Sequence, residues 1–113
     1  MEATSVNVCS NGSQFASGEY VGKVGDKMER VVVPKRCHEF SNKYGTAWVI
    51  RFDDLYGNHY LYFTNVCKTK DFILKHLYWR MSVEFVISAQ EVDRGLKVNK
   101  IKYARVIRHY CQQ

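Results

Sequence analysis

The sequence predicts an all-β fold with one short helix, closed into a five-stranded barrel. Three observations lead to this prediction. The chain has 113 residues, which suffice for one hydrophobic core but not for two. Its apolar fraction of 46% and charged fraction of 25% are ordinary for a folded globular protein. Segments rich in β-branched and aromatic residues alternate with turn signals, and one segment has helical spacing instead.

Composition along the chain sets the domain boundaries. Residues 1–18 are small and polar with no sustained period, so we expect a flexible N-terminal arm. The barrel is predicted over residues 19–108, and residues 109–113 remain as a short C-terminal tail. The sequence has no apolar run near eighteen residues and no basic-then-apolar start. We therefore expect a cytoplasmic protein with no membrane partner.

The first predicted strand spans residues 28–40 and follows a turn that Gly22 and Gly25 indicate. A run of three valines at its centre favours extended backbone. Pro34 cannot donate a hydrogen bond to a neighbouring strand, so we expect it at an edge, a bulge or a bend. A first strand that bends and serves two sheets is a feature of small barrels.

Four more strands and one helix are predicted farther along the chain. The strands cover residues 46–52, 59–64, 81–88 and 96–107, and the helix covers residues 68–78. The intervening loops are predicted at residues 41–45, 53–58 and 89–95. Five strands with a helix between the third and fourth is the order of the OB fold. This Greek-key barrel binds oligonucleotides on the face of its second and third strands and on adjoining loops.

The second and third strands form the clearest hairpin, and its register predicts two faces. If Phe52 lies opposite His59, the alternation of side chains assigns every residue to a face. The predicted core face collects Trp48, Ile50, Phe52, Leu61 and Phe63. The predicted outer face collects Ala47, Val49, Arg51, Tyr60, Tyr62 and Thr64. A shift of one residue in the register would exchange the faces.

Arg51, Tyr60 and Tyr62 are the central candidate binding residues on that outer face. An exposed tyrosine ring offers a flat surface on which an unpaired base stacks, with about 1–3 kcal/mol per base, and arginine pairs with phosphate. The alternative is that both tyrosines are half-buried sheet residues, which stabilise the hairpin through cross-strand contacts.

The charge of the chain favours a polyanionic partner. The formal net charge is +6, the isoelectric point is near 9.2, and aromatic residues reach 14%. The last strand and the turn before it are rich in basic residues: Arg94, Lys97, Lys100, Lys102, Arg105 and Arg108. Strand alternation places Lys100 and Lys102 on one side, and Lys97 and Arg105 on the other.

Part of this basic set completes the candidate site. We expect phosphate contacts from Arg94, Lys97, Lys100 and Lys102. Three residues of the first strand and its turn extend the set, namely Lys35, Arg36 and Lys43. The alternative is that the basic residues form an ordinary solvated face.

Five segments carry a family resemblance: GKVGDKM (22–28), YGTAW (44–48), FDDLYGN (52–58), YFT (62–64) and RGLK (94–97). Together they resemble the small OB-fold single-stranded-DNA-binding domains of phage and mobile-element DNA-processing proteins, over about residues 19–107. The resemblance implies that Tyr62 faces the nucleic acid. The sequence ends in RHYCQQ rather than in the acidic tail of replicative single-strand-binding proteins, so we do not expect partner recruitment through such a tail.

Signatures of catalysis and of metal binding are scarce. Asp53 and Asp54 are adjacent carboxylates, but they lie in a predicted turn, where aspartate is favoured. Cys37 and His38 point to opposite sides of a strand and cannot both reach one ion without a bulge. The four cysteines have no regular spacing and are expected as reduced thiols. We therefore predict no enzymatic activity, no cofactor and no metal.

The sequence thus predicts non-catalytic, largely sequence-independent binding of single-stranded DNA by aromatic stacking and phosphate attraction. Replication, recombination or transfer of a mobile element is the expected setting. Two alternatives stay open. One is a protein-interaction module within a DNA-processing complex, since a fold does not settle a function. The other is single-stranded RNA as the ligand. The oligomeric state is also open.

Overall fold

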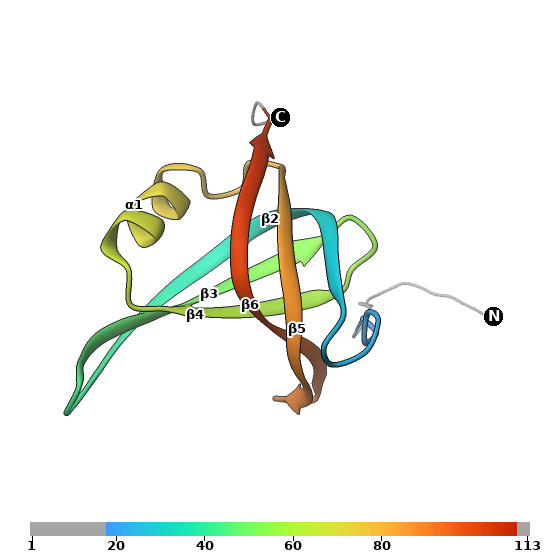
Figure 1. The fold of residues 1–113 in the computed structure, drawn as a ribbon, viewed down its shortest axis with the longest axis horizontal. Helices are drawn as coiled ribbons and strands as arrows, with labels where there is room; N and C mark the ends of the chain where they lie inside the picture. The colour runs from blue at the N-terminus through green and yellow to red at the C-terminus, as the bar shows by residue number, and fades with distance from the viewer. Residues whose placement is uncertain (1–17, 111–113) are drawn as a thin grey trace.

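The computed structural model describes residues 18–110, which form a closed barrel of five strands with one short helix (Figure 1). In chain order the elements are β2 (Lys27–Asn42), β3 (Gly45–Asp54), β4 (His59–Thr64), α1 (Cys67–Lys75), β5 (Met81–Asp93) and β6 (Leu96–His109). The predicted N-terminal arm falls outside the described residues except for Gly18, and so do residues 111–113 of the predicted tail.

The strand order around the barrel is β2-β3-β4-β6-β5, and β5 pairs with β2 to close it. Neighbouring strands are antiparallel except β4 and β6, which run parallel. The helix stands between the third and fourth of these strands in the chain. The predicted fold class, a five-stranded Greek-key barrel of the OB type, is therefore confirmed.

β2 closes the barrel because it serves two neighbours in turn. Its first part, residues 27–32, pairs with β5, and its second part, residues 32–42, pairs with β3. Pro34 is buried and lies where the β2–β3 register shifts, which confirms the predicted bend or bulge at this residue. The far end of the β2–β3 hairpin extends away from the barrel as a two-stranded ribbon (Figure 1).

Inward-facing side chains from the strands fill the core. On β3, the predicted core residues Trp48, Ile50 and Phe52 are all buried. The core contribution of β5 alternates in the same way and consists of Met81, Val83, Phe85 and Ile87. Ile73 is the buried residue of α1, and it joins the same hydrophobic cluster.

Several predicted boundaries are wrong. β2 continues to Asn42 and β3 to Asp54, each two residues beyond its predicted end, so both loops that follow are shorter than predicted. The loop expected at residues 89–95 is mostly strand, since β5 continues to Asp93 and β6 begins at Leu96. The helix ends at Lys75 rather than at residue 78, because the backbone of His76 is no longer helical and Tyr78 has a φ of 70°. Among residues 18–110, no helix is long and apolar enough to cross a membrane.

Candidate nucleic-acid interface

The β3–β4 hairpin has a register one residue away from the predicted one. Asp53, not Phe52, lies opposite His59, so that Phe52 pairs with Tyr60 and Ile50 pairs with Tyr62. The residues of β3 keep their predicted faces. The residues of β4 point to the face opposite the predicted one, because side chains alternate with a period of two.

The predicted outward orientation of Tyr60 and Tyr62 is consequently wrong. Tyr60 is fully buried, and its ring centroid lies 5.4 Å from that of Phe85. Tyr62 is half-buried and packs against the core cluster. The Tyr60 ring has no free surface for a base. The structure agrees here with the alternative, in which both tyrosines stabilise the sheet.

The Asp54 carboxylate sets the observed register by closing the β3–β4 turn. It accepts hydrogen bonds from the backbone N–H of Tyr56 at 2.8 Å and of Asn58 at 3.0 Å, and from the side-chain amide of Asn58 at 2.9 Å. The Tyr60 hydroxyl donates to the same carboxylate at 2.7 Å from inside the barrel. Gly57 has a φ of 89°, the positive value that a three-residue hairpin loop needs at its last position.

Protonation states keep this turn intact at neutral pH. Burial by itself would raise the pKa of the Asp54 carboxyl, but the hydrogen bonds from Tyr60, Asn58 and Tyr56 outweigh it and hold the pKa below its ordinary value. Burial, together with the hydrogen bond to Asp54, raises the pKa of the Tyr60 phenol well above its ordinary value. The predicted role in turn formation is confirmed for Asp54, whereas Asp53 lies within β3 and pairs with His59.

With β4 in this register, Leu61 and Phe63 lie on the outer face beside Arg51. The strand registers place four residues in one row across β2, β3, β4 and β6, namely Arg36, Arg51, Leu61 and Lys100. Phe63 stands two residues farther along β4 and is 48% exposed. The Lys100 Nζ lies 5.4 Å from the centroid of the Phe63 ring, and 3.2 Å from the Glu91 Oε2. An aromatic ring and cations therefore share this face.

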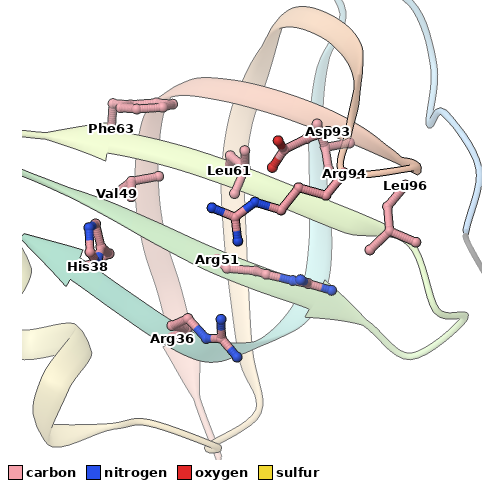
Figure 2. Close-up of a pocket in the computed structure, with 10 residues that line it drawn as sticks. Arg36, His38, Val49, Arg51, Leu61, Phe63, Asp93, Arg94 and Leu96 are labelled. Carbon is pink, nitrogen blue, oxygen red and sulfur yellow. The ribbon is translucent and has the colours of Figure 1, made fainter.

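A groove of about 460 Å³ crosses the same face beside the β5–β6 turn (Figure 2). We call it the outer groove, and its lining residues are Arg36, His38, Val49, Arg51, Leu61, Phe63, Asp93, Arg94, Leu96 and Val98. In Figure 2 the Arg94 side chain reaches from the turn over the groove toward β3. The lining thus combines an apolar floor with guanidinium groups.

Two neighbours fix the position of the Arg51 side chain in the outer groove. Its Nε lies 3.3 Å from the Asp53 Oδ1, and its Nη2 lies 2.8 Å from the His59 Nδ1. The same nitrogen of His59 lies 2.8 Å from the Asp53 Oδ1. His59 is buried, and its Nε2 has no hydrogen-bond partner among the described residues. Arg51 is therefore oriented before any ligand arrives.

The structure brings part of the predicted basic set to the outer groove. Arg36, Arg51 and Arg94 line it, and Lys100 borders it beside Phe63. Four lysines of the predicted set lie outside the lining: Lys35 over the ring of Tyr78, Lys43 over the ring of Tyr44, Lys97 paired with Glu19, and Lys102 over the ring of Tyr103. The hydrogen bond to Glu19 raises the pKa of Lys97.

Sequence reasoning missed His38 and, apart from Val49, the apolar members of the groove. Leu61 and Phe63 were expected in the core, and His38, Leu96 and Val98 had no predicted role. The overlooked signal is the turn sequence DLYGN at residues 54–58. An aspartate that accepts hydrogen bonds from the following amides, with glycine three residues later, extends β3 to Asp54, two residues beyond its predicted end, and shifts the partner of His59 by one residue.

Comparison with known proteins finds no matching family model, no matching curated protein and no matching solved structure. Within residues 18–110, the His, Cys, Asp and Glu side chains form no group of three that could hold a metal ion. Cys37 and Cys67 are free thiols, and burial raises the pKa of Cys37. The geometry of the outer groove is therefore the basis for a functional proposal.

Proposed function

We propose that the protein is a non-catalytic binder of single-stranded DNA, and that it holds the strand in the outer groove largely without regard to sequence. One observation carries the proposal: a half-exposed ring, Phe63, shares a groove with the guanidinium groups of Arg36, Arg51 and Arg94. Stacking of bases on an aromatic ring, beside cations that follow the phosphate backbone, is the chemistry of sequence-tolerant single-strand binding.

The location of the groove supports the same proposal. It lies over β3 and β4, the second and third strands of the barrel, and beside the turn between the last two strands. OB barrels bind oligonucleotides on this face and on these loops. A groove of about 460 Å³ suits individual unpaired nucleotides. The bases of a duplex stay stacked on one another and offer no free face to the Phe63 ring.

The expected setting is the processing of DNA in the cytoplasm, in replication, recombination or transfer of a mobile element. The free thiols of Cys37 and Cys67 are in keeping with a reducing compartment.

A titration of labelled oligo-dT, followed by fluorescence anisotropy, tests the proposal. We expect binding at low salt that weakens steeply between 50 and 200 mM salt, as release of counterions requires. Phe63→Ala should weaken binding by about tenfold, because a base loses its stacking partner. Equal lengths of single-stranded RNA and of duplex DNA belong in the same series, and the duplex should bind least.

Two control variants make the result specific to the outer groove. Tyr56→Ala removes a ring that is 81% exposed on the β3–β4 turn, outside the groove lining. Lys27→Ala removes one positive charge from the part of β2 that faces β5. Both should bind like the wild type. Absence of binding at low salt, or binding that ignores both salt and Phe63→Ala, would refute the proposal.

A further inference from the structure

Three arginines reach the outer groove from three different elements. Arg36 comes from β2, Arg51 from β3 and Arg94 from the turn between β5 and β6. Figure 2 shows the Arg94 side chain extending over β4 toward β3, the Arg51 side chain extending along β3, and the Arg36 side chain on the neighbouring strand β2. Of the described residues that line the groove, Asp93 is the one carboxylate. The lining therefore carries a net positive charge.

The pairing of Arg36 with Arg51 is unfavourable for folding by itself. The two residues are direct partners in the β2–β3 register, and like charges directly opposite each other destabilise a sheet. Arg51 has Asp53 as an ionic partner. Arg36 forms no ion pair within residues 18–110. Its charge is therefore not offset by an ion pair with any of the described residues.

The backbone conformation of Arg94 is a second feature of the groove that is unfavourable for folding, and it is independent of the Arg36–Arg51 pairing. Its φ is 54°, and the following Gly95 has a φ of 83°. A two-residue turn with both φ values positive favours asparagine or glycine at its first position. A side chain as large as arginine is uncommon in this left-handed region. The turn is therefore locally strained, and this conformation places the Arg94 guanidinium group over the groove.

We propose that these three arginines form a subsite for one phosphate group, and that Phe63 receives a base of the same strand. The inference rests on the proposed function. It assigns the phosphate and the base of the bound strand to two different places in the groove. A guanidinium fork fits the oxygens of a phosphate with paired hydrogen bonds, and a bound dianion or phosphodiester offsets the charge of Arg36 and Arg51. Phe63 stands two residues along β4 from the Arg51 row, about 7 Å away by strand geometry.

The phosphate in this subsite has two possible sources, which share one chemistry. It is either a phosphodiester within the strand or a phosphate at a strand terminus. A 5′-phosphorylated oligo-dT, a 3′-phosphorylated oligo-dT and the unphosphorylated oligomer of the same length distinguish them. Tighter binding of one phosphorylated end identifies a terminal phosphate, and equal binding of the three identifies the internal phosphodiester.

Arginine-to-lysine variants test the subsite, because they keep the charge and remove the planar fork. Arg36→Lys, Arg51→Lys and Arg94→Lys should each weaken oligo-dT binding by about fivefold or more, with little change in salt dependence. The double variant of Arg36 and Arg94 should lose less than the product of the two single losses, since both contact one phosphate. Arg105→Lys is the matched control, because Arg105 lies on β6 outside the groove and pairs with Glu84.

A direct readout separates failure of the subsite from failure of the proposed function. Titration with inorganic phosphate, observed through the arginine Nε–H signals in NMR spectra, should shift Arg36, Arg51 and Arg94 and leave Arg105 unmoved. If oligo-dT binds in a Phe63-dependent way while all three lysine variants bind like the wild type, the subsite is wrong and the proposed function stands. If phosphate shifts the three arginines but no oligonucleotide binds, the subsite stands and the proposed function is wrong.

Discussion

The Asp54 carboxylate links the surface turn of the β3–β4 hairpin to the interior of the barrel. On the outside it accepts hydrogen bonds from the backbone amides of the turn, and on the inside it accepts one from the Tyr60 hydroxyl. If the Tyr60 ring left the core, the Asp54 carboxylate would lose one of its hydrogen-bond donors. A single side chain therefore holds the β4 register, and with it the exposure of Phe63.

Removal of the Tyr60 hydroxyl should reduce stability without affecting binding. Tyr60→Phe keeps the buried ring but deletes the hydrogen bond to Asp54, and a hydrogen bond to a charged group contributes about 1.5–3 kcal/mol. We expect the free energy of unfolding, measured with urea, to fall by about that amount. The affinity for oligo-dT should stay within twofold of the wild type. A marked loss of affinity would mean that Tyr60 takes part in binding.

The pH dependence of stability should carry the signature of Asp54. The pKa of its carboxyl is lowered in the folded protein, so the ionised form is favoured by folding and contributes stability above the unfolded pKa, near 3.9. That stability is lost as the pH falls through the folded pKa. Asp54→Asn should therefore be clearly less stable than the wild type at pH 7, and the difference should shrink below pH 4. A difference that is constant with pH would contradict this assignment.

At the scale of elements, the β5–β6 turn combines strain with function. Arg94→Asn replaces a strained residue by one that the turn favours. We expect the variant to gain about 0.5–1 kcal/mol in urea denaturation and to bind oligo-dT several-fold more weakly. A gain in stability together with a loss of affinity distinguishes a functional arginine from a structural one. Val92→Thr, an exposed change on the same hairpin, should leave the affinity for oligo-dT unchanged.

The strands were predictable from sequence to a much greater degree than their exact pairing. Runs of β-branched and aromatic residues located all five strands, and β4 was predicted with its observed bounds. The side-chain faces depended on turn chemistry and bulges instead. The predicted site failed at Tyr60 and Tyr62 because the turn at Asp54 shifts the pairing of β4 against β3 by one residue, which inverts the faces of β4 but not those of β3.

A bulge in β6 is a second place where the simple alternation of side chains along a strand does not predict their direction. Glu84 pairs with Arg105 and Val86 pairs with Lys102, so two residues of β6 stand opposite one of β5. Tyr103, at this point, has a φ of 56°. Arg105 therefore lies on the outer side with Lys102, not opposite to it as alternation predicts. An irregularity of this kind has no signal in the pattern of hydrophobic residues.

At the scale of the whole molecule, a buried asparagine attaches the segment before β2 to the barrel. Asn99 is fully buried on β6, and its Oδ1 accepts a hydrogen bond from the backbone N–H of Val21 at 2.8 Å. Its Nδ2 donates to the backbone oxygens of Glu19 and of His59, at 3.2 and 3.1 Å. One side chain therefore joins the N-terminal segment, β4 and β6.

Loss of this side chain should loosen the N-terminal segment and lower global stability. Asn99→Ala leaves buried backbone groups without partners, and we expect a loss of about 2–4 kcal/mol in urea denaturation. Hydrogen exchange at the Val21 amide should accelerate beyond what the global loss explains. The Ile87 amide, which donates to the Asp26 oxygen, is the internal reference. Asn65→Ala, an exposed change, should cost less than about 0.5 kcal/mol.

The three-residue loop between Asp54 and Asn58 has a consequence for how this chain can evolve. Surface turns ordinarily tolerate insertions and deletions better than any other part of a barrel. Here the loss or gain of one residue would move β4 by one position against β3, and would exchange Leu61 and Phe63 for the two tyrosines on the outside. Related chains with the same function should accordingly vary freely at the exposed residues Leu55 and Tyr56, and keep the length of the turn. The length of this loop therefore determines which side chains of β4 form the binding surface.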